Sequence, residues 1–437
     1  MDTVYKLGEF PLTVAAGGKA LVGDIDGDGM MEAVFIKGDS GLDYRYVPHQ
    51  VASAAAYRLD GTLLWQVGDD SGTAGEFDAD FPAQLVDIDG DGALELVCVM
   101  QKQLLVLAGA TGAEKHRFAL PAADAHDCII VCDLTGRGYT GDLLLKNRYE
   151  RLWAMSLTDD RALQLLWEHR GNIGHFPLAV DINGDGHDEV MAGYDLLDCN
   201  GALLWSCKDL DEHADCLWAG DVFADGRIAV CVGGSDTCLY DATGNELWRY
   251  TGSVESQHVA LGHYDAEKST MQIAGLDRIE RGDGYRGSRH QGDKTPCGKD
   301  GIFFLNADGT ERWKEERKTP GWLTIVETYR HWCGRVQDYI LAYRRGGGLL
   351  PCLYDSELRR VAEFGTDGYI AHADFFGRGM NDALIYTPTK AVIYSGAPFD
   401  ITARLAELRQ QPSAHRSPLP HPRRLSMVTL YPGCVAE

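Results

Sequence analysis

Three short stretches of this 437-residue chain alternate oxygen-bearing side chains with glycines. They begin at Asp24, Asp87 and Asp181, and a glutamate follows eight residues after each of these aspartates. Oxygen ligands at every second position, on a loop that glycine allows to curl, suit a hard cation such as Ca²⁺. We therefore predict three DxDGDG-type loops that bind structural calcium (Ca2+) through these residues: Asp24, Asp26, Asp28 and Glu32; Asp87, Asp89, Asp91 and Glu95; Asp181, Asn183, Asp185 and Glu189. The alternative is a polar hairpin turn that holds no metal.

Apolar runs flank each loop, so the loop joins two strands rather than the two helices of an EF-hand. Three further loops, which begin at Asp133, Asp221 and Asp374, keep the glycine turn but lose some of the oxygen ligands. We expect no metal in these three.

Four histidines precede loop aspartates at matching distances. His126, His175, His213 and His258 each stand six to eight residues before such an aspartate, in successive repeats. A single histidine at this position is more often a hydrogen-bonded core imidazole. Four in register favour a site to which neighbouring repeats each contribute an imidazole.

Basic and phenolic side chains stand near the ends of the strands that follow. Lys146 and Arg148 are two residues apart, which places them on one face of a strand. A basic pair beside histidines, in a chain with a net charge of −24, would attract a carboxylate. The remaining members of this set are Tyr149, Tyr194, Arg278 and Arg344.

This combination suits β-elimination on a uronic acid. Arginine or lysine would neutralise the carboxylate, one histidine or tyrosine would take the C5 proton, and another would protonate the departing oxygen. We assign the carboxylate to Arg148 and Lys146, and the protons to His175 and Tyr194. His126 and His213 would shape the pocket or share the acid role, and the predicted substrate contacts are His258, Arg278, Tyr149 and Arg344. No pair of carboxylates stands out at these positions, which weakens a two-carboxylate glycosidase mechanism.

A second recurring phrase predicts the elements that position these residues. An Asp-Gly or Asn-Gly turn followed by a strand with a tryptophan recurs, as in Asp60–Trp65 and Asn200–Trp205. With the acidic loop, one unit is strand, loop, strand, strand, tight turn, strand, repeated about every 45 residues, which is a propeller blade. We predict an all-β, eight-bladed β-propeller with four antiparallel strands per blade, and seven blades as the alternative. The inner strands would begin near Gly18, Phe81, His126, His175, His213, His258, Trp322 and Tyr369.

The ends of the chain and one insertion depart from the repeat. Thr3–Val14 would supply the outer strand of the last blade and so cover its edge. The propeller would be a catalytic domain over residues 1–400, followed by an extended or partly disordered tail over 401–437, with a short helix at Thr402–Gln411. Glu280–Lys299 is a polar, glycine-rich insertion that could be a lid.

Composition narrows the partners. An excess of acidic residues argues against nucleic acids and anionic membranes. Met1–Val4 begins no secretory signal, and no apolar run reaches the roughly 18 residues of a membrane span. The twelve cysteines are scattered without a CxxC pair, which favours reduced thiols over zinc or redox chemistry. We expect a cytoplasmic protein.

Several of these phrases resemble calcium-binding β-propeller rhamnogalacturonan lyases. The resemblance covers about residues 18–395 and is carried by Val22–Gly29, Tyr57–Trp65, Gly174–Pro177 and His213–Asp215. More distantly, the chain is similar to propeller lyases that act on ulvan and on rhamnosyl-glucuronate linkages, which use histidine, tyrosine and arginine from adjacent blades. That likeness implies the set His126, Lys146 or Arg148, Tyr194 and His213.

The resemblance implies a polysaccharide or oligosaccharide lyase that cleaves rhamnose- and uronate-containing glycans. Two alternatives stay open. One is a propeller glycoside hydrolase of the rhamnosidase kind, and the other is a non-catalytic, calcium-stabilised propeller that binds carbohydrate or protein.

Overall fold

The computed structural model describes residues 1–39, 50–71, 82–211, 213–253, 255–278, 300–316, 325–344, 348–410, 418–419 and 433–436. The predicted insertion at Glu280–Lys299 and most of the predicted tail lie outside these residues. The chain forms two compact units. We call Thr3–His169 with Tyr369–Tyr431 the N-terminal unit, and Arg170–Gly368 with Met1–Asp2 and Pro432–Glu437 the middle unit.

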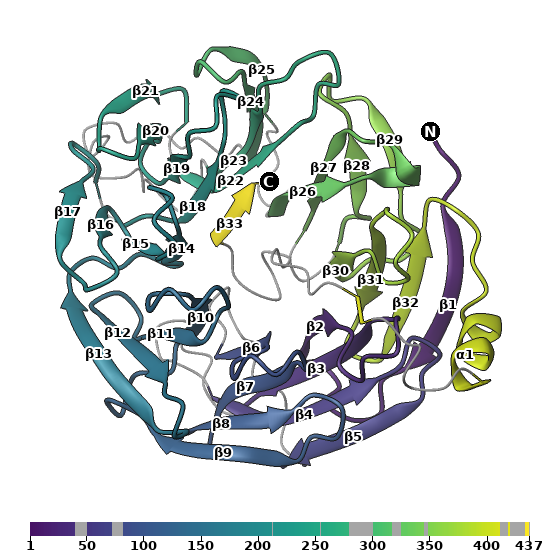
Figure 1. The fold of residues 1–437 in the computed structure, drawn as a ribbon. Coiled ribbons are helices and arrows are strands. Elements are labelled where there is room, and N and C mark those ends of the chain that lie inside the picture. Colours follow the sequence, from purple (N-terminus) through teal and green to yellow (C-terminus); the bar gives the residue numbers. More distant parts are fainter. Residues whose placement is uncertain are drawn as a thin grey trace. The chain divides into compact units, whose positions relative to one another are not determined.

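The N-terminal unit contains four blades, each a four-stranded antiparallel sheet (Figure 1). Blade 1 is β2 (Lys19–Gly23), β3 (Glu32–Gly38), β4 (Val51–Tyr57) and β5 (Leu63–Gly68). Blade 2 is β6 (Ala83–Val86), β7 (Glu95–Met100), β8 (Gln103–Ala108) and β9 (Glu114–Ala119). Blade 3 is β10 (Cys128–Cys132), β11 (Asp142–Lys146), β12 (Arg151–Leu157) and β13 (Leu163–Arg170). Blade 8 is β30 (Tyr369–Ala373), β31 (Asp382–Tyr386) and β32 (Lys390–Ser395), completed by β1 (Tyr5–Pro11).

The middle unit contains four more blades. Blade 4 is β14 (Leu178–Val180), β15 (Glu189–Ala192), β16 (Asp195–Leu197) and β17 (Leu203–Ser206). Blade 5 is β18 (Cys216–Gly220), β19 (Ala229–Gly233), β20 (Thr237–Asp241) and β21 (Glu246–Tyr250). Blade 6 is β22 (Ser256–Gly262), β23 (Gln272–Arg278), β24 (Asp300–Leu305) and β25 (Glu311–Glu316). Blade 7 is β26 (Ile325–Arg330), β27 (Asp338–Tyr343), β28 (Cys352–Tyr354) and β29 (Arg360–Glu363). The C-terminal strand β33 (Gly433–Ala436) pairs in parallel with β18.

Eight four-stranded blades make the chain an eight-bladed β-propeller, as the repeat count predicted. Each predicted inner strand begins within three residues of its expected position, as at β18 and β30. The N-terminal strand β1 pairs with β32 at the edge of blade 8, which confirms the predicted closure.

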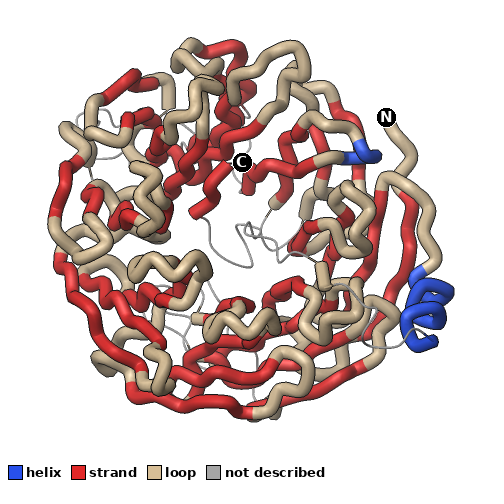
Figure 2. Tube along the Cα trace, in the orientation of Figure 1, coloured by secondary structure: helices blue, strands red, loops and turns tan. Residues whose placement is uncertain are grey.

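The described residues are nearly all strands and loops, apart from helix α1 (Ile401–Gln410) and a 3₁₀ turn at Trp332–Gly334 (Figure 2). None of the helices in the described part is long and apolar enough to cross a membrane.

The recurring glycine turns and tryptophans lock one blade to the next. The Trp65 indole donates to the carbonyl of Gly109 at 2.6 Å and covers the Gly112 turn of blade 2, where a Cβ would lie 2.8 Å from the ring. The same indole-to-carbonyl contact joins later blades of the middle unit, from Trp205 to Ala242 at 3.1 Å and from Trp248 to Ala307 at 2.9 Å. A turn glycine is needed because a larger residue would meet the ring.

First strands of neighbouring blades lie side by side within each unit. In the middle unit β14 contacts β18, β18 contacts β22, and β22 contacts β26. The loops that enter these strands are therefore neighbours as well. This arrangement is what brings residues about 40 positions apart in the sequence into one site.

Candidate functional site

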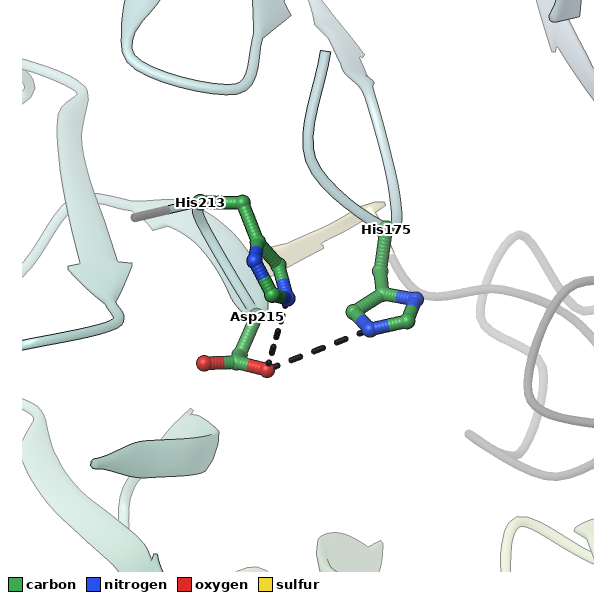
Figure 3. Close-up of side chains that lie close together, drawn as sticks. All are labelled: His175, His213 and Asp215. Carbon is green, nitrogen blue, oxygen red and sulfur yellow. Dashed lines mark ion pairs between the residues drawn. The ribbon is translucent and has the colours of Figure 1, made fainter. Parts of the chain in front are cut away.

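Two imidazoles of the middle unit converge on one buried carboxylate. The Nε2 atoms of His213 and His175 lie 3.6 Å and 4.0 Å from the same oxygen, Oδ1 of Asp215 (Figure 3). The two rings stand edge to face, with centroids 5.1 Å apart. Asp215 is only 4% exposed, while both histidines are partly exposed. Both distances exceed an ordinary hydrogen bond, but they allow an ion pair once an imidazole is protonated.

Local backbone geometry produces this convergence. His175 precedes β14 and His213 precedes β18, and each stands three residues before its strand. His213 and Asp215 are two residues apart in the segment that leads into β18, and their side chains lie close together (Figure 3). The His175 amide donates to the Ala214 carbonyl at 3.0 Å, which ties the two loops together.

Gly174 allows these loops to approach. Its φ is +69°, and a Cβ at this position would lie 2.6 Å from the Ala214 carbonyl oxygen. A non-glycine residue would therefore strain the backbone and also push the two loops apart.

Two further side chains, Gln257 and Tyr194, lie near Asp215. The Gln257 amide donates to Oδ1 of Asp215 at 2.8 Å, which fixes the carboxylate. The Tyr194 hydroxyl donates to the Asp211 carbonyl at 3.1 Å and lies against Gly234. Burial, and then the charge of Asp215, raise the pKa of Tyr194 above its usual value. Tyr194 therefore stays protonated near neutral pH, where it can donate a proton but not accept one.

The remaining predicted site residues of the middle unit lie elsewhere. His258 lies within β22 instead of before it, is 5% exposed, and its Nδ1 accepts the Val326 amide at 3.3 Å. Arg344 is exposed after the end of β27. Arg278 ends β23, and its side chain lies outside the described part of the structure. The structure thus brings together His175, His213 and Tyr194, but not His258.

The predicted basic pair of the N-terminal unit surrounds a different carboxylate. The Lys146 ammonium is 1% exposed and lies 2.6 Å from Oδ2 of Asp127. It also donates to the carbonyl of Arg148 at 2.8 Å. An Arg148 guanidinium nitrogen lies 3.5 Å from Oδ1 of Asp127, and the guanidinium covers the Tyr149 ring at 5.4 Å. His126, directly before Asp127, is 9% exposed. Asp127 therefore already neutralises Lys146.

Sequence reasoning missed the acidic partners Asp215 and Asp127. Each lies one or two residues after a predicted histidine, and the phrase His213-Ala214-Asp215 carries a usable signal. In an extended segment, side chains two residues apart project to the same side. A carboxylate two positions from a candidate histidine base is therefore a candidate partner for that histidine. Gln257 had no such signal, because it comes from the next blade.

The same three side chains could also hold a transition-metal ion. One ring nitrogen of each imidazole and one carboxylate oxygen lie within 4.8 Å of one another. Two imidazoles and a carboxylate are a common ligand set for divalent transition metals.

The first acidic loop is rich in buried negative charge. Asp24, Asp28 and Glu32 are each 5% exposed or less, and burial raises the pKa of Asp28 to about 6. Loop amides donate to these carboxylates, for instance Gly29 to Asp24 at 2.9 Å. A basic side chain, Arg58, contacts this loop at 2.5 Å from Asp26. One guanidinium does not balance four carboxylates, so these residues fit a bound Ca²⁺.

In the third loop, a side-chain amide donates hydrogen bonds to two of the carboxylates. Asn183 donates to Glu189 at 2.8 Å and to Asp185 at 3.1 Å. Burial raises the pKa of Glu189 to about 7. With Asp181 these side chains supply carboxylate oxygens of the type that Ca²⁺ binds.

The second loop differs, because a lysine lies among its acidic side chains. The Lys115 ammonium lies 2.7 Å from Glu95, 2.9 Å from Asp89 and 3.3 Å from Asp91. Carboxylate oxygens of Asp87, Asp89 and Glu95 lie within 4.8 Å of one another, close enough to hold one metal ion. The ammonium group of Lys115 already lies among them, so a metal ion would have to displace it.

Comparisons with known proteins show the fold. No protein-family model matches the chain, and no curated protein sequence does either. Among solved structures, the exotype rhamnogalacturonan lyase YesX matches with a TM-score of 0.67 at 20% identity, over 98% of this chain and 84% of that one. A rhamnogalacturonan lyase from Bacillus licheniformis matches with a TM-score of 0.62 at 19% identity, over 89% and 75%. The V. cholerae biofilm matrix protein Bap1 matches with a TM-score of 0.59 at 14% identity, over 91% of each chain. In its propeller fold, this chain is similar to rhamnogalacturonan lyases and to Bap1.

Proposed function

We propose that the chain is a lyase that cleaves rhamnose- and uronate-containing polysaccharides or oligosaccharides by β-elimination. The observation that carries this proposal is the convergence of His175 and His213 on the buried Asp215. The fold likeness to rhamnogalacturonan lyases supports the substrate class. At identities near 20%, the residues themselves must supply the argument for catalysis.

The elimination needs one base and one acid. One imidazole takes the C5 proton of the uronate, the electron pair forms the C4–C5 double bond, and the C4–O bond breaks. The departing oxygen receives a proton from the second imidazole or from Tyr194, which is kept protonated by its surroundings. Asp215 stabilises whichever imidazole is charged, since its Oδ1 faces both Nε2 atoms.

A cation must also neutralise the uronate carboxylate, because the C5 proton is otherwise poorly acidic. We keep Arg278 and Arg344, which belong to the same unit as His175 and His213, as the proposed candidates. Lys146 is buried against Asp127, so in this proposal it has a structural role. His258 remains a proposed contributor to the shape of this site, while His126, Arg148 and Tyr149 stay predictions for the N-terminal unit. We also propose that the first and third acidic loops hold structural Ca²⁺, which would neutralise their buried carboxylates.

The test is lyase turnover measured by ultraviolet absorbance of the new double bond, with pectic and ulvan oligosaccharides as substrates. His175→Ala and His213→Ala should each lower the rate by at least about 100-fold, the usual worth of a positioned acid or base. His116→Ala, a histidine on the outer strand β9, is the matched control and should retain activity. Full activity in both site variants would remove the assignment.

Product analysis separates the lyase from a glycoside hydrolase. Hydrolysis adds one water to the products and creates no double bond, so mass spectrometry distinguishes the two reactions.

A metal role for the histidines is tested by a transition-metal chelator. Activity that survives the chelator agrees with imidazoles that act directly.

A second candidate function is carbohydrate or protein binding without turnover. The likeness to Bap1, a biofilm matrix protein, favours it. It predicts saturable binding of an oligosaccharide that is recovered unchanged after long incubation. Under this alternative, His175→Ala would weaken binding instead of blocking a reaction.

A further inference from the structure

We infer that the second acidic loop is closed by the ammonium group of Lys115, which takes the place of a metal ion. The inference rests on the proposal that the first and third loops bind calcium. Under this inference the three similar loops differ in how their negative charge is neutralised. The first and third loops bind a metal ion, and the second contains the Lys115 ammonium group.

The contacts of Lys115 are those of a bound cation. Its Nζ lies within 3.3 Å of carboxylate oxygens from Asp89, Asp91 and Glu95, which are three of the four predicted ligands. Calcium would need the same oxygens at about 2.3–2.6 Å. An ion at that distance from Asp89 and Glu95 would overlap the ammonium group or repel it. Arg161 adds a second positive charge at 3.3 Å from Asp89.

A β-bulge explains why this lysine reaches the loop. In the outer strand of blade 2, His116 pairs with Val106 and Glu114 pairs with Leu107, so Lys115 is the extra residue between them. A bulge redirects the side chain of its extra residue out of the regular alternation. Here the redirected side chain meets the loop of its own blade.

The same bulge recurs in other blades, where the type of its extra residue can be compared with the contacts of the acidic loop in that blade. The extra residue is Leu64 in blade 1 and Leu204 in blade 4, which are the blades of the first and third loops. In blade 6 it is Arg312, whose guanidinium lies 2.7 Å from Asp265 in the loop of that blade. In blades 2 and 6, a basic residue at the bulge thus reaches the loop carboxylates.

Blades 1 and 4, which hold the first and third loops, have no basic residue at the bulge position. Leu204 is 51% exposed and carries no charge. In blade 1, Arg58 comes from the turn after β4 and reaches Asp26, with Asp28 at 3.9 Å. Within the described residues, no ion pair joins Asp24 or Glu32 to a basic side chain.

The experiment counts bound calcium per chain by equilibrium dialysis and follows thermal unfolding with and without a calcium chelator. Lys115→Leu restores the residue type of blades 1 and 4. We expect it to bind one more calcium than the unaltered protein and to gain a larger calcium-dependent rise in Tm. Arg117→Leu, two residues along the same strand, pairs with Glu114 outside the loop and should leave the count unchanged.

Two further variants keep the inference falsifiable if Lys115→Leu does not fold. Leu204→Lys should lose one calcium, since it places an ammonium beside the third loop. Asp89→Asn in the otherwise unaltered protein should leave the count unchanged. A count that falls by one with Asp89→Asn would overturn the inference while the calcium proposal stands. Absence of bound calcium in the unaltered protein and in every variant would instead overturn the calcium proposal.

Discussion

At the scale of single residues, a buried carboxylate ties stability to pH. Asp382 is fully buried on β31, and its Oδ1 lies 2.6 Å from the Arg378 guanidinium. Burial raises the pKa of Asp382 from 3.8 to about 7, although the arginine opposes this rise. Folding therefore takes up a proton between these two values. The stabilisation is complete below about pH 4 and is lost as the pH rises through 7.

We predict that Asp382→Asn flattens the pH dependence of unfolding. The shift corresponds to at most ~4 kcal/mol between pH 4 and pH 7, which the amide cannot contribute because it does not titrate. The measurement is the free energy of unfolding in urea at several pH values. Glu407→Gln is the control, because this carboxylate is 66% exposed on α1. A variant curve as steep as that of the unaltered protein would contradict the prediction.

Single residues also mark the limit of sequence reasoning about the site. His175 and His213 could be found because both stand at one position of a repeating unit. Asp215 and Asp127 were missed because the sequence repeat was used to find the site residues. The repeat does not indicate which carboxylates lie next to them. The neutralisation of Lys146 by Asp127 depends on a distance between two strands, which no spacing along the chain reveals.

At the scale of elements, the entry loop of β14 positions His175. Gly174→Ala should keep the fold and lower lyase turnover, because the added Cβ meets the Ala214 carbonyl and moves His175 away from Asp215. The left-handed backbone itself costs about 1 kcal/mol for alanine. Gly138→Ala is a matched control, since Gly138 has a φ of +78° with no atom within 4 Å of a Cβ.

Turnover and Tm of both glycine variants separate the two effects. A loss of turnover only in Gly174→Ala, measured well below the Tm of both variants, would support the role of this loop contact in positioning the His175 imidazole. Equal turnover in the two variants would show that the site tolerates displacement of this loop.

Elements were predictable where a local pattern specifies them. The Asp-Gly turns, the tryptophans and the acidic loops each define a strand end, so the blade starts were predicted closely. The bulge in the outer strands was not predicted, because it is an offset in pairing between two strands. That offset gives Lys115 its contact with the second loop, and so the sequence alone predicted three equal calcium loops.

At the scale of the whole molecule, blade number and edge closure follow from the repeat. Eight inner-strand patterns predicted eight blades, and the spare N-terminal segment predicted the missing outer strand of blade 8. The fold was therefore predictable almost entirely, since each blade needs a neighbour against which to bury its faces. The side chains proposed for acid–base catalysis do not recur in every blade, so the repeat that predicts the fold does not assign their roles.

The closure strand β1 gives the last prediction, on the stability of the N-terminal unit. Phe10 is 3% exposed, stacks on Tyr57 with centroids 5.7 Å apart, and covers the Gly61 turn of blade 1. The Tyr57 hydroxyl in turn bonds the backbone of Val14 at 2.9 Å and 3.0 Å. Phe10 thus fastens the strand that closes blade 8 to the neighbouring blade 1.

Phe10→Ala should lower the free energy of unfolding by about 3–5 kcal/mol, the usual range for a buried phenylalanine. It should also promote association between molecules, because a loosened β1 exposes the edge of β32. Chemical denaturation and light scattering measure the two effects. Tyr5→Ala, on the same strand but 38% exposed, should change both far less. Equal effects of the two substitutions would show that β1 closes the propeller through backbone pairing alone, without help from the Phe10 anchor.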